Sequence, residues 1–471
     1  VSDFAQLDPP RLSANPRRSV VILAEGGYVS RLLSEVITIE RLIPGGDGFG
    51  RLADGCPVFV SGAFPGDEVA VLELDRRPGY ARATSFRLEK PSALRVRAEC
   101  PVADACGGCD WMTLELGAQR AGKLEILRDA LRRTGGFQEL PFEIRSVVGP
   151  STQYRSRVRV RVREGKLGFF AKGSHQLVQF ESCLVATPAV NRALDKLREY
   201  VALRPGDFEQ FDEAEVRALP GEERPTLCLW LGEKRRGLTS ASRRMLEGMK
   251  DDFIVGVKRS TRQGERVVVR AEEHHHLSVS GGIRLRLGPF DFSQVNLEIN
   301  QRIVDELVQG AGQRHARSFL DLYCGAGNFS LPLRRAGIWG VGIESNPSAI
   351  VHAQAALDEQ LSGADAPSIT AKTPPFIAGH VAPQTKLLLE AKQVFDLVVL
   401  DPPRSGAKEV IESVAKLARK WVFVCACDPV TFARDLKLLV SKGFELEQVT
   451  AYDMFPQTHH VEATAWLRKR G

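Results

Sequence analysis

From about residue 289 onward, the chain alternates short apolar runs with longer segments of helical periodicity. The runs at residues 318–322, 340–343 and 395–400 have the length and composition of buried strands. Strands that alternate with helices form parallel sheets, because each parallel pair needs a crossover between its strands. The alternation therefore predicts an α/β domain with a doubly wound parallel sheet over residues 289–471.

Glycines and acids follow these strands directly. The first strand leads into the loop Tyr323-Cys324-Gly325-Ala326-Gly327-Asn328, the second ends on Glu344, and the third ends on Asp401. The glycines let the backbone approach a ligand at the carboxyl end of the first strand, and Glu344 is placed to accept ribose hydroxyls. The loop lacks the full G-x-G-x-x-G of dinucleotide domains, which favours S-adenosylmethionine as the ligand.

A thiol lies at another junction of strand and helix. Residues 422–426 form an apolar run, and Asp428 and Pro429 then supply an N-cap residue and a first-turn proline. Cys427 therefore precedes a helix N-terminus, where unpaired N–H groups and the helix dipole favour a thiolate. Cys425, inside the apolar run, is expected to be a buried structural cysteine. From position alone, a reactive and a structural role for Cys427 both stay open.

Three further cysteines crowd one short loop. Cys100, Cys106 and Cys109 form a C-x5-C-x2-C pattern, with a glycine pair that lets the backbone fold around them. This pattern predicts a metal or cluster site whose fourth ligand lies elsewhere, and Cys183 is the nearest unclaimed cysteine. Spacing alone does not separate zinc from an iron–sulfur cluster.

The N-terminal part of the chain has a different pattern of apolar residues and turns. Residues 1–34 show no sustained periodicity and are expected to be an extension, whereas residues 35–93 contain short strands between glycine-rich turns. Such strands predict a small barrel of the OB type, a fold that commonly binds oligonucleotides. Few acids interleave with its basic residues, which favours RNA contact over a solvated rim. These residues are Arg76, Arg77, Arg82, Arg87, Lys90, Arg95 and Arg97.

Residues 94–288 are expected to form a mixed, strand-rich central domain, with an amphipathic helix over residues 114–133 that could pack on the α/β domain of residues 289–471. Within this region arginines alternate with small or apolar residues over residues 155–163. At strand period, the arginines share one face. A row of like charges is unfavourable unless an anion neutralises it, so this face is predicted to bind nucleic acid.

Composition limits the classes that remain. A chain of 471 residues is too long for one ordinary core, and a net charge of +6 suits a polyanionic partner. We expect no membrane span and no obligate protein partner. The chain has nine cysteines, three of them in one loop. This pattern is typical of metal ligands and reactive thiols in a reducing compartment, so the cytoplasm is the expected location.

Together these motifs resemble the RNA uracil-5 methyltransferase family, in its form with a TRAM domain and a [4Fe–4S] cluster. The resemblance runs from about Glu35 to the C-terminus and includes the F-x-Q-V-N motif at residues 292–296. It implies a Rossmann-like S-adenosylmethionine methyltransferase domain behind a TRAM barrel. It also implies that Cys100, Cys106, Cys109 and Cys183 hold the cluster. The cofactor contacts that it implies are Gln294, Tyr323, Gly325, Gly327, Asn328, Glu344, His380 and Asp401.

In this family Cys427 matches the nucleophile and Glu462 the general base of uridine C5 methylation. The form with TRAM domain and cluster resembles enzymes that act on 23S rRNA, with tRNA as the alternative substrate. The chain departs from the family pattern at four positions, which are Ser293, His380, Ala426 and Asp428. We expect Asp428 to be tolerated, because an N-cap carboxylate shares its charge with backbone N–H groups.

Two other readings compete. Asp401-Pro402-Pro403 echoes the D-P-P-Y motif of exocyclic-amine methyltransferases, but Arg404 occupies the aromatic position and a thiol is present. The second alternative is a non-catalytic RNA-binding iron–sulfur protein.

Overall fold

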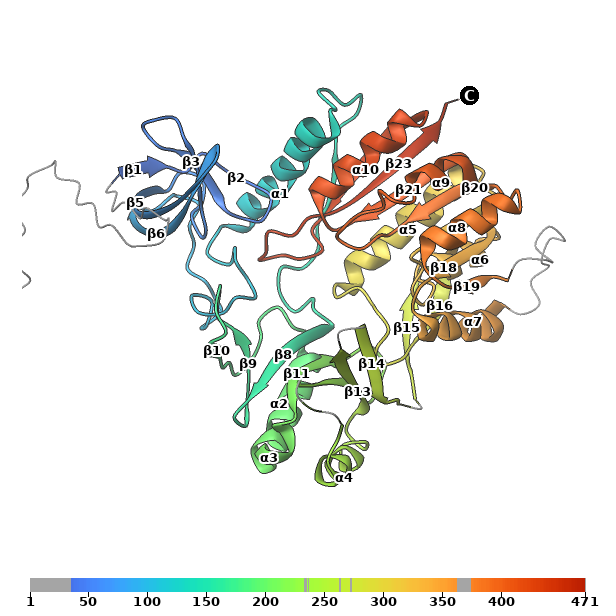
Figure 1. Ribbon diagram of the computed structural model, residues 1–471, viewed down its shortest axis with the longest axis horizontal. Helices are drawn as coiled ribbons and strands as arrows, with labels where there is room; N and C mark the ends of the chain where they lie inside the picture. The colour runs from blue at the N-terminus through green and yellow to red at the C-terminus, as the bar shows by residue number, and fades with distance from the viewer. Residues whose placement is uncertain are drawn as a thin grey trace, which may run out of the picture. The chain divides into compact units, whose positions relative to one another are not determined.

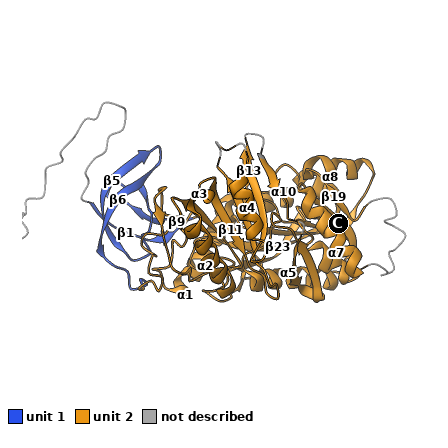
Figure 2. Ribbon diagram, turned by 90° about the horizontal axis from the view of Figure 1, so that it is seen from below, with its two compact units in different colours: residues 1–43, 47–95 blue, residues 44–46, 96–471 orange. Residues whose placement is uncertain are grey.

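The structure is a computed structural model that describes residues 35–470, except 233, 234, 236, 262, 263, 272 and 362–373. The extension expected over residues 1–34 lies outside the described residues. The chain forms two compact units, one of residues 1–43 and 47–95 and the other of residues 44–46 and 96–471 (Figure 2).

The first unit is a six-stranded sheet with the order β1-β5-β6-β4-β3-β2. Alternate apolar side chains, among them Val58, Val60, Val69 and Val71, are fully buried in its core. This confirms the strand-rich unit that the glycine-rich turns predict. Its strands are β1 (Glu35–Thr38), β2 (Arg41–Leu42), β3 (Gly48–Arg51), β4 (Pro57–Val60), β5 (Glu68–Arg77) and β6 (Tyr80–Lys90).

The basic residues of this unit are mostly paired, which the sequence argument did not anticipate. Of the seven basic residues singled out from the sequence, six lie in this unit, and each forms an ion pair with a carboxylate of a neighbouring strand or turn; Arg97 lies outside the unit. The pairs are Arg76–Asp54 at 3.2 Å, Arg77–Asp75 at 2.9 Å, Arg82–Asp47 at 2.6 Å, Arg87–Glu89 at 2.5 Å, Lys90–Glu68 at 2.8 Å and Arg95–Asp67 at 2.7 Å. The premise of unpaired positive charge was therefore wrong for these six.

The second unit begins with the cysteine loop and contains a central sheet with the order β10-β9-β8-β11-β12-β13-β14. Helix α2 (Pro188–Leu203) buries Leu194 and Leu197 in one core with Val158, Val160 and Val162 of β8. The strands are β8 (Arg157–Arg163), β9 (Lys166–Phe170), β10 (Leu177–Val178), β11 (Phe211–Arg217), β12 (Thr226–Leu231), β13 (Ile254–Thr261) and β14 (Gly264–Val269). The other elements of this region are α3 (Pro205–Phe208), α4 (Ser240–Gly248), the 3-10 turn η2 (Ser280–Gly282) and the hairpin β15 (His275–Val279) and β16 (Ile283–Leu287).

The arginines of β8 do share one face, but the protein supplies their anions. Strand β11 lies antiparallel beside β8 and presents Glu213 and Glu215 opposite Arg161 and Arg159. Arg159 pairs with Glu213 at 3.3 Å and with Glu215 at 3.2 Å, and Arg161 pairs with Glu213. Glutamates of the protein itself thus neutralise part of this row of like charges. The row is therefore not, by itself, evidence that this face binds a nucleic acid. The sequence argument failed because the neutralising strand lies about fifty residues away in the chain.

The remaining sheet has eight strands with the order β19-β18-β17-β20-β21-β23-β22-β7. Strands β17 to β21 are mutually parallel, and β23 is antiparallel to both of its neighbours. The strands are β7 (Arg145–Val147), β17 (Ser318–Leu322), β18 (Trp339–Glu344), β19 (Phe376–Ala378), β20 (Phe395–Leu400), β21 (Ala418–Ala426), β22 (Phe444–Tyr452) and β23 (Glu462–Lys469). The helices are α5 (Leu297–Gln313), α6 (Ser330–Arg335), α7 (Pro347–Leu361), α8 (Val381–Glu390), α9 (Ile411–Leu417) and α10 (Pro429–Ser441). This is the doubly wound sheet that the alternation predicts.

The segment before the central sheet also packs against this eight-stranded sheet and its helices. Helix α1 (Leu116–Ala130) continues as the π-helical turn η1 (Leu131–Gly135), which ends at Gly136 in the left-handed conformation, with φ 79°. Both pack against α10, as Figure 1 shows for α1. Strand β7 then joins the outer edge of the sheet beside β22.

Candidate active site

The carboxyl ends of the parallel strands define the site. From β17 the chain moves through α6 and α7 to β18 and β19 on one side, and it returns through α8 to β20 on the other. Since crossovers are right-handed, the two groups of helices cover opposite faces of the sheet. The strand order reverses between β17 and β20, and ligands of such sheets bind in the crevice at that point.

The loop after β17 is shaped to approach a ligand closely. Tyr323 and Gly325 both have positive φ angles, of 67° and 54°. A side chain added at Gly325 would meet nothing within 4 Å, so open space lies above this backbone. The Gly325 N–H donates to the Glu344 carboxylate at 3.3 Å, which joins the loop to the end of β18. This loop therefore leaves open space close to the Glu344 carboxylate.

Two of the other predicted cofactor contacts follow parallel strands of this sheet. Asp401 follows β20, and His380 is exposed after β19, where it is the N-cap residue of α8. Gln294 is half-buried between β16 and α5. The Asn328 amide exchanges two hydrogen bonds of 2.9 Å with the buried Asn300 of α5, so part of its capacity is used within the protein.

The predicted nucleophile and base meet at the end of two neighbouring strands. Strand β21 pairs with β23 so that Ala426 lies opposite Ala463, and the next positions of this antiparallel register are Cys427 and Glu462. Cys427 is half-buried, whereas Glu462 is only 2% exposed. The last strand of the chain, β23, thus brings the Glu462 carboxyl group close to the Cys427 thiol.

The acidity of Cys427 differs from the expectation. Burial and the nearby Glu462 carboxylate raise the pKa of its thiol to about 11, although the Arg404 guanidinium acts in the opposite direction. The helix N-terminus therefore does not produce a resting thiolate. Asp428 behaves as expected, because its carboxylate caps α10 by accepting the Thr431 N–H at 2.7 Å.

A buried cluster surrounds Glu462. One oxygen of Asp401, one oxygen of Glu462 and the Cys425 sulfur lie within 4.8 Å of one another, and the Cys425 thiol donates to Glu462 Oε1 at 3.3 Å. Burial and then the Asp401 charge raise the pKa of Glu462 to about 8, while burial raises the pKa of Asp401 to about 7. Carboxyl groups with such pKa values can take up and release protons near neutral pH.

Sequence reasoning missed the contact of Cys425 with the base. It assigned Cys425 correctly to the buried strand, where the residue is 0% exposed. Residues two apart on a strand face the same side, so the spacing of Cys425 and Cys427 was the available signal. It also overlooked His460, whose Nε2 lies 3.5 Å from the Arg404 guanidinium beside the thiol.

The four predicted cluster ligands line one cavity. Cys100, Cys106, Cys109 and Cys183 surround a volume of about 280 Å³, together with apolar side chains and two arginines. Burial, with the other thiols adding to it, raises the pKa of Cys109 to about 12. Among the described residues, the one group of three or more donor side chains within 4.8 Å of one another is Asp401, Cys425 and Glu462. No three of the four cysteine sulfurs therefore lie within 4.8 Å of one another.

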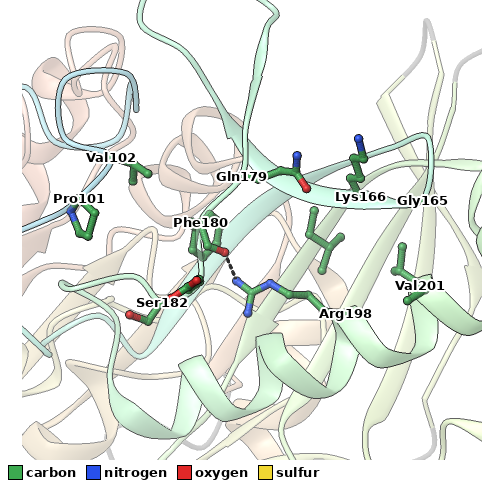
Figure 3. A pocket seen from close by; sticks show the side chains of 12 residues that line it. Pro101, Val102, Gly165, Lys166, Gln179, Phe180, Ser182, Arg198 and Val201 are labelled. Atoms are coloured by element: carbon green, nitrogen blue, oxygen red, sulfur yellow. Dashed lines mark hydrogen bonds between the residues drawn. The ribbon is translucent and has the colours of Figure 1, made fainter. Parts of the chain in front are cut away.

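A larger cavity of about 600 Å³ shares Val102, Phe180 and Ser182 with the cysteine cavity. Figure 3 shows Arg198 pointing at the Phe180 carbonyl, to which it donates at 2.9 Å. Its guanidinium also lies 4.8 Å from the centre of the Phe180 ring. Arg198 thus holds Phe180, a residue that lines both this cavity and the cysteine cavity.

The described helices include none with the length and apolar character that crossing a membrane requires.

Comparisons with known proteins agree with this geometry. The family described as tRNA (Uracil-5-)-methyltransferase matches residues 121–363 and 384–470, and the TRAM domain matches residues 35–86. The 23S rRNA (uracil(1939)-C(5))-methyltransferase RlmD of Pseudomonas aeruginosa is 32% identical over 451 residues, covering 91% of this chain and 93% of its own. The enzyme of the same name from Vibrio parahaemolyticus is 30% identical, covering 92% and 96%.

Among solved structures, the fold is similar to that of the Pyrococcus abyssi tRNA (uracil-54, C5)-methyltransferase in complex with S-adenosyl-L-homocysteine. The TM-score is 0.67 at 23% identity, over 92% of this chain and 100% of that one. This likeness covers the methyltransferase fold. The chain therefore belongs to the tRNA (uracil-5-)-methyltransferase family, as an RNA methyltransferase with an N-terminal TRAM domain.

Proposed function

We propose that this enzyme methylates C5 of a uridine in 23S rRNA, with Cys427 as nucleophile and Glu462 as general base. The observation that carries the proposal is the register of β21 and β23, whose last pair, Ala426 and Ala463, lies one position from Cys427 on one strand and from Glu462 on the other. The relatives named as 23S rRNA enzymes, each matched over more than nine-tenths of its length, support the choice of substrate. A ribosomal substrate implies action in the cytoplasm.

Uracil C5 is a weak nucleophile, so the ring must first gain electron density. The Cys427 thiol first releases its proton to solvent, and the sulfur then adds to C6, which forms an S–C6 bond and leaves an enolate whose C5 can accept a methyl group. The Arg404 guanidinium favours the thiolate form needed for this addition. S-adenosylmethionine supplies the electrophilic methyl group when bound.

The second half of the reaction needs a base. Glu462 removes the proton from C5, the electron pair of that C–H bond re-forms the C5–C6 double bond, and the S–C6 bond breaks to release Cys427. A carboxyl group with a pKa near 8 is partly ionised at neutral pH and accepts a proton readily. The uridine must leave its stack to reach both residues.

We assign the remaining site residues to cofactor and cluster. The cofactor contacts are Gln294, Tyr323, Gly325, Gly327, Asn328, Glu344, His380 and Asp401. Cys100, Cys106, Cys109 and Cys183 would hold a [4Fe–4S] cluster, and the single cavity that the four residues line supports this assignment. We divide the chain into an extension (1–34), a TRAM domain (35–93), a central domain (94–288) and a methyltransferase domain (289–471), with α1 and β7 added to the last.

The test uses RNA that contains 5-fluorouridine, because fluorine at C5 cannot leave as a cation and the covalent adduct persists. The wild-type enzyme should form an adduct that survives denaturation, and Cys427→Ala should form neither adduct nor 5-methyluridine. Glu462→Gln should accumulate an adduct on ordinary uridine RNA, because only the elimination is blocked. Equal turnover in all three proteins would refute the proposal, and parallel assays with 23S rRNA and tRNA decide the substrate.

A further inference from the structure

The loop of residues 453–461 connects β22 to β23 and ends at Glu462. Residues between 110 and 154, which follow Cys109, hold the loop of residues 453–461 in place by hydrogen bonds along most of its length. Its hydrogen bonds are Trp111 N to Gln457 O at 3.1 Å, Gln119 Nε2 to Gln457 Oε1 at 2.9 Å, Lys123 Nζ to Phe455 O at 2.8 Å and Tyr154 Oη to Pro456 O at 2.9 Å. The loop therefore depends on distant residues for its shape.

The tightest of these links starts beside a cysteine. Asp110 follows Cys109, and its Oδ2 lies 2.6 Å from His459 Nδ1. Its other oxygen accepts the His459 backbone N–H at 3.2 Å, so one carboxylate holds both the ring and the backbone of His459. The ring centroids of His459 and His460 are 4.2 Å apart, and His460 lies beside Arg404. The chain of contacts thus runs from the cysteine loop to the neighbourhood of Cys427.

A second link reaches the same loop. Arg155 lines the cysteine cavity, and its Nε donates to the Tyr154 hydroxyl at 3.4 Å. That hydroxyl in turn donates to the carbonyl of Pro456. Two independent paths therefore join the cysteine cavity to the loop before Glu462.

The loop needs this support. Gln457 has a φ of 68°, a left-handed conformation that is unfavourable for a residue with a side chain. Such a conformation persists only where the surroundings hold it. Without its hydrogen bonds, the loop would relax and Glu462 would lose its fixed place opposite Cys427.

We propose that Asp110 and His459 are positioning residues that tie the loop 453–461 to the cysteine loop and so set the general base relative to the nucleophile. The inference rests on the proposed function, because it assumes the role of Glu462. The proposal also assigns a role to the cysteine site. An ordered cysteine loop would keep the loop 453–461, and with it Glu462, in its position.

The test separates turnover from folding. Active sites are counted as the denaturation-resistant adduct with 5-fluorouridine RNA, and methylation is then expressed per active site. Asp110→Leu and His459→Phe should lower turnover per active site about tenfold to a hundredfold, because a small displacement of a catalytic group has a large effect on rate. His459→Asn keeps a side-chain N–H donor and should stay within about threefold of the wild type.

The matched control is Asp104→Leu, which removes an exposed acid of the same loop that forms no hydrogen bond within the described residues. A variant that is merely destabilised would lose active sites without losing turnover per site, so that pattern in both Asp110→Leu and His459→Phe would overturn the inference.

Hydrogen exchange provides a readout that does not depend on activity. Amides of residues 453–461 should exchange about fivefold to tenfold faster in Asp110→Leu and in Cys109→Ser, while those of residues 376–390 stay unchanged as an internal reference. Unchanged exchange at 453–461 in both variants would overturn the inference. If the wild type itself forms no adduct and methylates no RNA, the proposed function fails instead.

Discussion

Single side chains set the chemistry of the catalytic pair. Glu462 is buried beside Asp401, and both effects favour its protonated form. The thiol of Cys425 acts in the opposite direction, because a donor to the carboxylate stabilises the ionised form. The buried Cys425 therefore lowers the pKa of Glu462, the proposed base, toward neutral pH.

Replacing Cys425 should change the pH dependence of the enzyme. Cys425→Val removes the donor at similar volume, so the pKa of Glu462 should rise and single-turnover release of 5-methyluridine RNA from the covalent adduct should need a pH about half a unit to one unit higher to reach its half-maximum. Rate increases with pH in either protein because both thiolate and carboxylate are required. Cys425→Ser keeps a donor and serves as the control. Superimposable profiles of wild type and Cys425→Val would contradict the role assigned to the thiol.

Glu462 should also affect stability. Its folded pKa of about 8 exceeds the ordinary value of 4.5, so the folded protein binds more protons than the unfolded chain between these values and loses stability as pH rises through that window. Glu462→Gln removes this loss. We expect its free energy of unfolding to match the wild type near pH 4.5 and to exceed it by a few kcal/mol at pH 9. Urea unfolding at both pH values measures the difference, and a gap that does not grow with pH would exclude the mechanism.

At the scale of elements, the junction between β21 and α10 explains how an acid can follow the nucleophile. Asp428 and Pro429 begin α10 as the sequence predicts, with the Asp428 carboxylate bound to the Thr431 N–H. The charge is thus directed at the helix terminus, where it is favourable.

This cap gives a prediction for the element. Asp428→Ala should lower the free energy of unfolding by about 1 kcal/mol, because α10 loses its side-chain cap. Asp428→Asn keeps a capping oxygen and should be nearly as stable as the wild type, with an equal or faster rate of adduct formation since a charge next to the thiol is removed. Denaturant unfolding and the rate of the 5-fluorouridine adduct test both statements; a slower adduct in Asp428→Asn would mean that the charge itself is needed.

At the scale of the whole molecule, ion pairs between distant segments adjust how much positive charge is available to RNA. The arginine row of β8 carries four guanidinium groups at residues 157–163, and two glutamates of β11 partly neutralise it. Aromatic rings accompany the row, since Arg159 lies 4.1 Å from the ring centroid of Trp230 and Arg157 lies 5.2 Å from that of Phe292, which is 60% exposed. Such a surface can still stack bases and contact phosphates.

Removing the two glutamates should strengthen RNA binding. In Glu213→Gln/Glu215→Gln the freed arginines can contact phosphates, so the plot of log K against log salt should steepen by about 1.4 to 1.8 for two added contacts. The control is Glu139→Gln/Glu143→Gln, which changes the net charge equally at two exposed acids. If both double variants show the same slope, this face does not contact RNA.

The sequence by itself determined the features that depend on local pattern. Strands β17 and β20 begin and end where their apolar runs do, and α10 begins where its cap residue and proline stand. The glycine loop and the cysteine spacing were also visible, because chemistry that needs several residues in one loop leaves a local signature.

Tertiary structure decided what depends on neighbours that are remote in the chain. The pairing of the arginine row needed β11, the raised pKa of Cys427 needed a carboxylate from the last strand, and the contact of Asp110 with His459 joins residues 349 positions apart. Local patterns specify backbone conformation and burial, whereas charge balance and proton affinity depend on every group packed nearby. For that reason the sequence could predict candidate reactive residues, whereas the shifts in their pKa values depend on the folded chain.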